Sequence, residues 1–365
     1  MLHADVQMAD RVRVFVELKS GIEAGRAGGP RAADEDRLDV NQAFVDMRLG
    51  AKGRRSVILR LGRHEMDYGD GSLVSYREGP NVRRGYDGPK VIAHLAAWQV
   101  DAFMARPVET DPGLFDDGWE AARGFWGIYA SAQDPVLGVF GRPEVYYVGL
   151  ARDGVRYDQG IGPETRHTLG MRVTHRTGGF DYWLEGTYQF GTFAGGAIRA
   201  WKHVQVYSYA FDRAPLRPRP GLNLAISSGD RDPRDPDLQT FHPLVPKGLY
   251  YGYIDGTGSL NAIVLHPSTT LQLARPLSLR TDVFVFWRQR TTDGIYSQPG
   301  VFLRTGQQSG ARLVGSLGQL ELGWRIDPHA TLTLQAGHYW PGPFLRETPP
   351  ARDMTYLSAK VSYKF

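Results

Sequence analysis

The sequence contains no cysteine, and this absence excludes disulfides, thiolate metal sites and a cysteine nucleophile. It also has no run of about 18 apolar residues, the length that a membrane-spanning helix needs. The first ten residues, MLHADVQMAD, lack a basic segment followed by an apolar one, so no signal peptide is recognisable. The motifs GxSxG, HExxH and the phosphate-binding loop are missing too, and we therefore expect neither an enzyme nor a cofactor.

Charge of one sign is not in large excess, because 43 Lys and Arg stand against 39 Asp and Glu. Nucleic-acid binding needs basic residues clustered on a recognisable motif, and we find none, so we expect no nucleic-acid partner. Glycine is abundant with 44 residues, proline contributes 23, and aromatic residues make up 12% of the chain. This composition favours many short strands joined by turns over a helical protein.

Alternation of apolar and polar residues is the main pattern. In RVRVFVELK (11–19) three valines and Leu18 lie on one face, whereas Arg13, Glu17 and Lys19 lie on the other. Counting such runs predicts about 17 strands of roughly 9–13 residues, the length that crosses a bilayer when tilted. The expected strands are 2–9, 11–20, 41–51, 54–64, 88–95, 98–107, 123–132, 143–152, 164–176, 179–191, 196–211, 218–228, 260–273, 277–289, 311–325, 329–340 and 353–365.

The connections between these runs differ in length in an ordered way. Very short turns (AD, AKGR, RTGG, ARPL, DPH) alternate with long polar loops at 21–40, 65–87, 108–122, 229–259 and 290–310. Short turns at one end and long loops at the other are typical of a transmembrane antiparallel β-barrel in an outer membrane. The alternative is a soluble β-sandwich or propeller. Because no linker divides the chain, we expect one all-β domain over residues 1–365.

The strand count is odd, whereas bacterial single-chain barrels have even numbers. We therefore expect that a signal peptide and a first strand lie upstream of this sequence. The last strand, LSAKVSYKF, should turn Leu357, Val361, Tyr363 and Phe365 toward lipid and Lys360 toward the lumen. In this chain it either closes on the strand at 2–9 or leaves an open seam.

Two long segments resemble a known family. LRLGRHEMDYGDGSLVSYREGPNVRRGYDG (59–88) and SSGDRDPRDPDLQTFHPLVPKGLYYG (227–252) are similar to the alginate export family, outer-membrane porins that release an anionic polyuronate. The resemblance implies an 18-stranded barrel in the bacterial outer membrane that exports an anionic polysaccharide. It also implies a monomer in contact with membrane lipid, lipopolysaccharide and a periplasmic secretion scaffold. The alternatives are a porin for small anions or oligosaccharides and a barrel with a plugged lumen.

An anionic substrate requires cations along its path, because rings of Arg and Lys lower the energy of anions in a narrow passage. The alternation of inward and outward residues along each strand (here called strand parity), together with the resembling segments, predicts which residues line a substrate pathway through a lumen. Its basic residues are Arg13, Lys19, Arg48, Arg60, Arg63, Arg83, Arg84, Arg172, Arg280, Arg288, Arg325 and Lys360, and its acidic residues are Glu17, Asp101, Glu185 and Asp282. The alternative is that these charges pair and brace the wall. We expect no metal site among them.

Two loops carry further hypotheses. Arg83 and Arg84 in EGPNVRRGYDG, and Arg77 just before it, belong either to a solvated surface loop or to a loop folded into the lumen, and we favour the latter. The run SSGDRDPRDPD suggests a Ca²⁺ site, but its prolines and the lack of a suitably spaced Glu favour an ordinary acidic loop.

Aromatic residues near strand ends are expected to form interfacial girdles. These are Trp98, Trp126, Tyr146, Tyr147, Trp201, Trp287, Trp324, Tyr339 and Trp340. Trp183, Phe284 and Phe286 are instead candidates for stacking against sugar rings inside a lumen.

Overall fold

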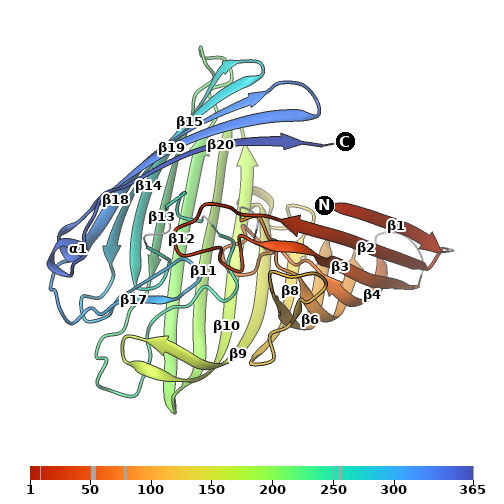
Figure 1. Cartoon of the computed structure of the whole chain (residues 1–365). Helices are drawn as coiled ribbons and strands as arrows, with labels where there is room; N and C mark the ends of the chain where they lie inside the picture. Colours follow the sequence, from red (N-terminus) through yellow and green to blue (C-terminus); the bar gives the residue numbers. More distant parts are fainter. Residues whose placement is uncertain (9, 51–54, 78–79, 249, 255–256, 365) are drawn as a thin grey trace.

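The chain forms one continuous β-sheet that curves round to a hollow wall (Figure 1). The computed structural model describes residues 1–8, 10–50, 55–77, 80–248, 250–254 and 257–364. Its wall strands are β1 (Leu2–Met8), β2 (Val12–Gly21), β3 (Asp36–Leu49), β4 (Arg55–His64), β5 (Tyr86–Leu95), β6 (Trp98–Glu109), β8 (Arg123–Ala132), β9 (Arg142–Tyr157), β10 (Gly160–Thr177), β11 (Phe180–Phe193), β12 (Gly196–Tyr209), β13 (Arg219–Ser227), β14 (Ala262–Ala274), β15 (Leu277–Arg288), β18 (Leu313–Arg325), β19 (Ala330–Pro341) and β20 (Met354–Tyr363). Each of the predicted strands overlaps one of these, so the all-β prediction is confirmed.

The remaining elements are short. β7 (Gly118–Trp119) pairs with the end of β6, while β16 (Ile295–Tyr296) and β17 (Phe302–Arg304) form a separate small sheet. The helical elements among the described residues are a 3-10 turn (Gly138–Phe140) and α1 (Pro343–Glu347). None of the helices described is long and apolar enough to cross a membrane.

Neighbouring wall strands pair antiparallel all along the chain, with β15 pairing with β18 across the loop between them. Side-chain alternation follows the pleat. On β20, Leu357, Val361 and Tyr363 are 76%, 72% and 65% exposed on the outer face, whereas the Ser358 hydroxyl bonds Gln335 inside. The outward apolar face predicted for this strand is therefore present, except that Phe365 lies outside the described residues.

Glycine allows β3 and β4 to approach closely at one position of the wall. Gly62 in β4 has φ +123°, and a Cβ there would come 2.2 Å from the carbonyl oxygen of Ala43 on β3. No larger residue fits this close approach of two backbones, so this position of the wall requires glycine.

The loops are largely sorted by length, as expected. Short connections such as 178–179, 275–276 and 326–329 lie at the end where β20 finishes, and the loops 65–85, 228–261 and 289–312 lie at the opposite end, here called the loop end. Two tight turns at the loop end, 158–159 and 194–195, depart from the rule. The expected turn at 51–54 lies outside the described residues.

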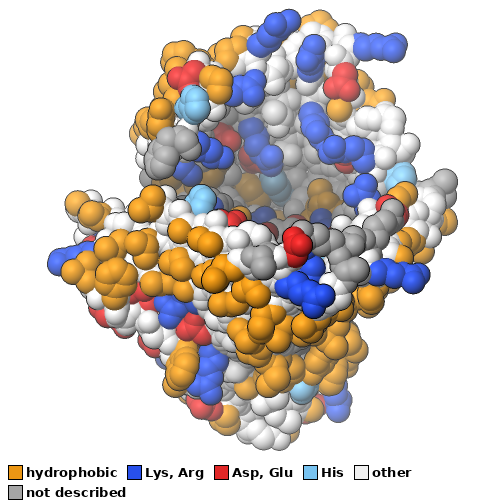
Figure 2. Space-filling model, turned by 90° about the vertical axis from the view of Figure 1, so that its right-hand side faces the viewer, with side chains coloured by type: hydrophobic (Ala, Val, Ile, Leu, Met, Phe, Trp, Pro, Cys, Tyr) orange, Lys and Arg blue, Asp and Glu red, His pale blue; other side chains and the backbone are white. Residues whose placement is uncertain are grey.

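The wall is open along one side. Among the described residues β1 and β20 form no pairing with each other, and every residue of β1 is exposed. Both ends of the chain lie on this side in Figure 1, and Figure 2 looks into the hollow from there, with Lys and Arg side chains around it. Of the two arrangements expected for the last strand, the open seam is the one present. A further strand upstream stays a prediction.

Candidate functional site

The hollow is narrowed by two loops that fold inward. Val74 of the 65–85 loop and Val245 of the 228–261 loop form a parallel bridge, and both side chains are at most 1% exposed. Together with Met66, Leu238 and Phe241 they join a hydrophobic cluster with residues of the wall. The prediction that EGPNVRRGYDG belongs to an inward-folded loop agrees with this packing, although residues 78–79 lie outside the described part.

A polar contact fastens the same two loops. The Tyr250 hydroxyl donates to Asp70 Oδ2 at 2.8 Å, and Lys247 Nζ donates to the Asp70 carbonyl at 2.6 Å. Burial and the charge of Asp70 raise the pKa of Tyr250 well above its ordinary value, so the hydroxyl stays a donor. The loops therefore form one packed unit inside the wall.

Most predicted pathway charges on the first strands are paired. Asp46 on β3 accepts Arg60 Nε and Nη2 at 2.7 and 2.8 Å and lies 3.4 Å from Arg13 Nη1. The Arg60 guanidinium also stacks on the Phe44 ring, 3.8 Å from its centroid. On the next strands Lys90 Nζ lies 2.7 Å from Asp101. These pairs follow from cross-strand register, which sets opposite charges side by side.

The strands further along repeat this pairing. Arg172 donates to Glu144 at 2.6 Å and lies over Trp183 at 4.7 Å. Arg280 bonds Asp282, which also accepts His266 Nε2 at 2.7 Å. Such pairs fix side chains along the wall and lower the field that each arginine presents to a solute.

Glu185 and Lys202 differ from these pairs. Both are buried, and the Glu185 carboxylate is 4.0 Å from Lys202 Nζ. Glu185 Oε2 and Lys202 Nζ have no hydrogen-bond partner within the described part of the chain. The Tyr146 hydroxyl donates to Glu185 Oε1 at 2.8 Å.

At the loop end, Lys19 and Arg63 neutralise a group of acids. Lys19 Nζ lies 3.0 Å from Asp36 and 2.7 Å from Asp117, and Arg63 bonds Asp87 through two nitrogens at 2.8 and 3.0 Å. Glu17 accepts the Asn41 amide nearby at 2.6 Å. In this region Asp39, Asp116 and Asp117 are close enough to share a metal ion. However, their oxygens already accept Lys19 and backbone N–H groups.

An arginine cluster with few acid partners among the described residues lies at the inward loops, where Arg123 alone pairs with an acid, Glu120, at 3.1 Å. Arg84 acts electrostatically on both Arg77 and Arg123, and in the described residues neither Arg77 nor Arg84 forms an ion pair. The Nε atoms of Arg77 and Arg123 are buried and make no hydrogen bond to the described residues. Burial and Arg84 lower the pKa of Arg77 to about 9, and its backbone adopts φ +63°. We call Arg77, Arg84 and Arg123 the loop-end arginine cluster.

The sequence pattern missed two of these three residues as pathway residues. Arg77 stands in the quoted loop, but no strand parity applies to it. Arg123 is the first residue of β8, whose bounds agree with the predicted strand at 123–132, but the pathway prediction did not include it. Arg83, by contrast, is partly neutralised, because it lies 3.5 Å from Glu65 and 4.8 Å from the Tyr76 ring.

A second basic group continues from this cluster along β9 and β10. Arg152 and Arg166 both bond the buried Glu164, and Arg152 Nη1 lies 3.0 Å from His242 Nε2 of the 228–261 loop. Burial and the neighbouring arginines hold the pKa of His242 well below its ordinary range. The imidazole is therefore neutral, and one carboxylate faces two guanidinium groups.

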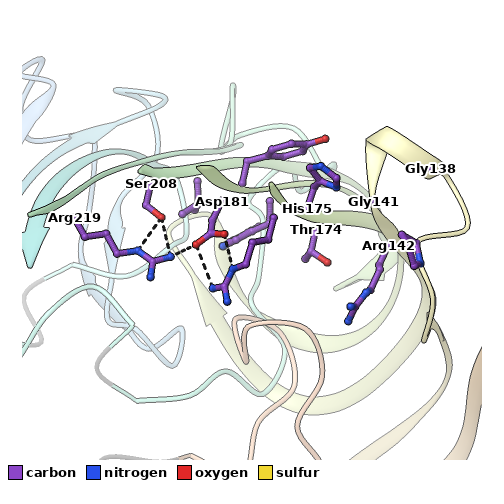
Figure 3. Close-up of a pocket in the computed structure, with 13 residues that line it drawn as sticks. Gly138, Gly141, Arg142, Thr174, His175, Asp181, Ser208 and Arg219 are labelled. Carbon is purple, nitrogen blue, oxygen red and sulfur yellow. Dashed lines mark hydrogen bonds and ion pairs between the residues drawn. The ribbon is translucent and has the colours of Figure 1, made fainter. Parts of the chain in front are cut away.

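The short-turn end of the wall has its own basic cavity, with a volume of about 630 Å³. Figure 3 shows Arg219 and Asp181 turned toward each other, with Arg142 across the pocket. Asp181 accepts both Arg176 and Arg219, and Arg142 lines the same cavity. Three arginines thus stand against one aspartate, and sequence reasoning had selected none of them.

The remaining predicted residues lie elsewhere. Arg48 reaches the Asp10 carbonyl at 3.5 Å, and Arg325 and Lys360 are exposed near the short-turn end. Arg288 is a correction: its guanidinium is fully buried and donates to the carbonyls of Thr291, Asp293, Gly306, Ser309 and Ala311. It faces inward as parity predicted, but the 289–312 loop covers it, so it clamps that loop and does not line an open path.

The aromatic predictions divide in the same way. Trp201, Trp324 and Trp340 are 40–48% exposed on the outer face, as a girdle requires. Tyr146 and Tyr339 are a correction, because both are buried inside and their hydroxyls bond Glu185 and the Val314 carbonyl. Phe284 and Phe286 are buried beneath inner side chains and offer no free ring face to a sugar.

Comparisons with known proteins agree with this architecture. The model of a family described as alginate export matches residues 1–360, while no curated protein matches the chain. Among solved structures, Pseudomonas aeruginosa OccK2 (OpdF) in complex with glucuronate is 10% identical, with a TM-score of 0.58, 97% of this chain and 85% of that chain covered. Acinetobacter baumannii OccAB3 is 11% identical, with a TM-score of 0.61 and 97% and 87% covered. Pseudomonas aeruginosa OpdK with vanillate is 13% identical, with a TM-score of 0.57 and 96% and 87% covered.

Proposed function

Because the chain belongs to the alginate export family and is a porin-type β-barrel of the bacterial outer membrane, we propose that it exports an anionic polysaccharide of the polyuronate class. The polymer passes through the lumen by diffusion, with no covalent step and no cofactor. The barrel works as a monomer whose apolar outer face contacts lipid and lipopolysaccharide. A periplasmic secretion scaffold delivers the polymer.

The loop-end arginine cluster carries this proposal. A buried guanidinium without an acid partner is costly unless an anion visits it. Arg77 makes no ion pair with the described residues and keeps a buried Nε without a partner among them; Arg123 pairs with Glu120 at 3.1 Å, but its Nε is likewise buried and unpartnered there. A carboxylate matches the arginine fork and gains charge-assisted hydrogen bonds there.

The second support is the spacing of positive charge along the hollow. The loop end holds Arg77, Arg84 and Arg123, and the short-turn end holds Arg142, Arg176 and Arg219 with Asp181. A polyuronate has one carboxylate on every sugar, so it can contact both groups at once. One structural neighbour was solved with glucuronate, a single sugar acid.

The second candidate is a porin for small anions or oligosaccharides. It is favoured by the inward loops, which pack on the wall and narrow the lumen. A cavity of about 450 Å³ beside them is lined by Glu65, Asp67, Asp101 and Glu144, with Lys90. Such an acid-rich stretch favours transport of short solutes over a long polyanion unless the loops move.

Reversal potentials in planar bilayers test the shared claim of anion preference. We expect anion selectivity in the native protein and a smaller anion preference in Arg84→Gln. Arg84→Lys keeps the charge and should keep most of the selectivity. Arg199→Gln is the matched control, because Arg199 is exposed and pairs with Asp237 at 3.5 Å. Cation preference in the native protein contradicts the proposal.

Block of the current by oligouronates of increasing length separates the two candidates. Polymer export predicts that affinity rises with chain length, because longer chains contact both basic groups. A small-anion porin predicts equal block by the monomer and the longer oligomers.

A further inference from the structure

The carboxylate of Asp230 is buried without a partner. Asp230 lies in the 228–261 loop and is 1% exposed, and neither carboxylate oxygen makes a hydrogen bond to the described residues. The N–H groups of Arg231 and Gln239 lie near enough to favour its charged form slightly. An ionised carboxylate in this position has lost its water and gained little in return.

A second carboxylate stands beside it. Asp293 of the 289–312 loop is fully buried, and its Oδ2 accepts the Asp230 N–H at 2.9 Å and the Thr240 hydroxyl at 2.6 Å. Its Oδ1 accepts the Tyr296 hydroxyl at 2.7 Å. These donors fix the orientation of Asp293, and its charge acts directly on Asp230.

Among the described residues, the surroundings of this pair supply oxygens, and no Lys or Arg nitrogen pairs with either carboxylate. Gln239 follows in the same loop, and its Oε1 is buried without a partner in the described structure. Asp235 adds further negative charge. Arg288 is the cation that acts on Asp293, but its nitrogens donate to backbone carbonyls. Burial and the charges of Asp293 and Asp235 raise the pKa of Asp230 to about 7, and burial and the charge of Asp158 raise that of Asp293 to about 6.

We propose that Asp230 and Asp293 bind a divalent cation with a preference for hard oxygen ligands, namely Ca²⁺, and that this ion fastens the 228–261 loop to the 289–312 loop. Hard cations take carboxylate, amide and carbonyl oxygens, which are the groups present here. The Gln239 amide oxygen is the further side-chain ligand. The ion supplies the positive charge that the buried pair lacks.

The site differs from the one that the acidic run suggests. Asp232 pairs with Arg234 at 2.9 Å, and Asp237 accepts the Ala197 N–H at 3.1 Å. Only Asp230 of the run has both oxygens buried and free of partners in the described chain. Its companion Asp293 is 63 residues away in the sequence, so spacing alone does not find it.

The two loops already meet at this point. The Thr292 hydroxyl donates to the Asp230 carbonyl at 2.6 Å, and Gly229 N–H donates to Gln289 Oε1 at 3.1 Å. An ion between Asp230 and Asp293 therefore stiffens an existing junction. Protection of the 228–261 loop from proteolysis by the ion can therefore be measured independently of transport.

Terbium luminescence on the full chain tests the site directly. The protein is refolded into detergent from inclusion bodies, because lipopolysaccharide itself binds Ca²⁺. Tyr296 bonds Asp293 and serves as the sensitiser. We expect sensitised Tb³⁺ emission at pH 7.5 that Ca²⁺ displaces. Asp230→Asn should weaken binding by more than the roughly 10–100-fold loss typical of removing an outer-sphere partner.

Asp232→Asn is the matched control, since it removes one acid of the same run whose partner is an exposed arginine. It should bind Tb³⁺ as the native protein does. Ca²⁺ should also protect the 228–261 loop from proteolysis in the native protein and in Asp232→Asn, but not in Asp230→Asn. Circular dichroism checks that each variant has folded. If Asp230→Asn does not fold, Asp293→Asn takes its place in both experiments. Absence of Ca²⁺-displaceable emission in the native protein, or its persistence in Asp230→Asn, overturns the proposal.

Discussion

Tyr250 and Asp70, which are 180 positions apart in the sequence, are joined by a hydrogen bond of 2.8 Å between the hydroxyl and Oδ2. Asp70 belongs to the 65–85 loop and Tyr250 to the 228–261 loop, so this bond ties together the two segments that narrow the lumen. The loops can open only if it breaks or if both loops move as one unit.

Tyr250→Phe should loosen this tie. A hydrogen bond to a charged group contributes about 1.5–3 kcal/mol, and its loss leaves Asp70 with one donor fewer. We expect more frequent conductance substates and a larger mean single-channel current. Tyr253→Phe is the control, because the Tyr253 hydroxyl bonds Glu321 on the wall and not the other loop. Identical single-channel records for Tyr250→Phe and the native protein would show that the tie does not limit the opening.

Acidification should remove the contribution of His242 to the stability of the 228–261 loop, while protonation of Asp230 and Asp293, whose pKa values are raised, acts in the opposite direction. Burial and Arg152, Arg166 and Arg123 hold the pKa of His242 below its ordinary value. His242 takes up a proton below about pH 6.5 in the unfolded loop and not in the folded loop, so its contribution to stability is complete above that pH and falls below it. The loss is about 1.4 kcal/mol for each pH unit. Hydrogen exchange at residues 238–245 measures it.

His242→Asn keeps an acceptor toward the Leu244 N–H but has no titrating ring. After correction for intrinsic exchange, acidification from pH 7.5 to pH 5 should therefore leave this loop more protected in His242→Asn than in the native protein. His338→Gln, on the outer face, should retain the native pH dependence. Equal pH dependence in His242→Asn and the native protein would assign the effect to other groups.

Arg288→Lys should free the 289–312 loop without altering ion selectivity. Lysine has one nitrogen in place of three, and most of the carbonyls that Arg288 holds are left without a donor. We expect faster proteolysis between residues 289 and 312 and an unchanged reversal potential. Arg312→Lys removes one exposed contact to the Gln289 carbonyl and should leave proteolysis near the native rate. A lower anion preference in Arg288→Lys would show that Arg288 does line the substrate pathway.

Asp46→Asn should raise anion preference, because Asp46 neutralises both Arg13 and Arg60. One unit charge at about 4 Å in water is worth about 1 kcal/mol, or roughly a fivefold change in local anion concentration. Reversal potentials check the direction. Asp353→Asn, exposed and paired with His338 outside the lumen, should leave them unchanged. A shift toward cations in Asp46→Asn would mean that this acid does not moderate the path.

Local sequence signals determined the frame of this protein. Apolar and polar residues alternate with the pleat of each strand, so every long strand and the lipid-facing side of β20 could be read along the chain. The same period shows why Tyr146 and Tyr147 could not both belong to a girdle: neighbours on a strand point to opposite faces, and Tyr146 bonds Glu185 inside. The alternation along β15 also predicted correctly that Arg288 faces inward.

Only the tertiary structure decided what stands next to each inward residue. Cross-strand register placed Asp46 between Arg13 and Arg60, and loop folding buried Arg288 under 289–312. Arg84 meets Arg123, and Asp230 meets Asp293, because separate segments of the chain pack together inside the wall. The alternation along a strand depends only on residues next to one another in the sequence, whereas these contacts join residues on different strands and loops. The sequence therefore determined the strands of the wall, and the tertiary structure decided which charged groups meet inside it.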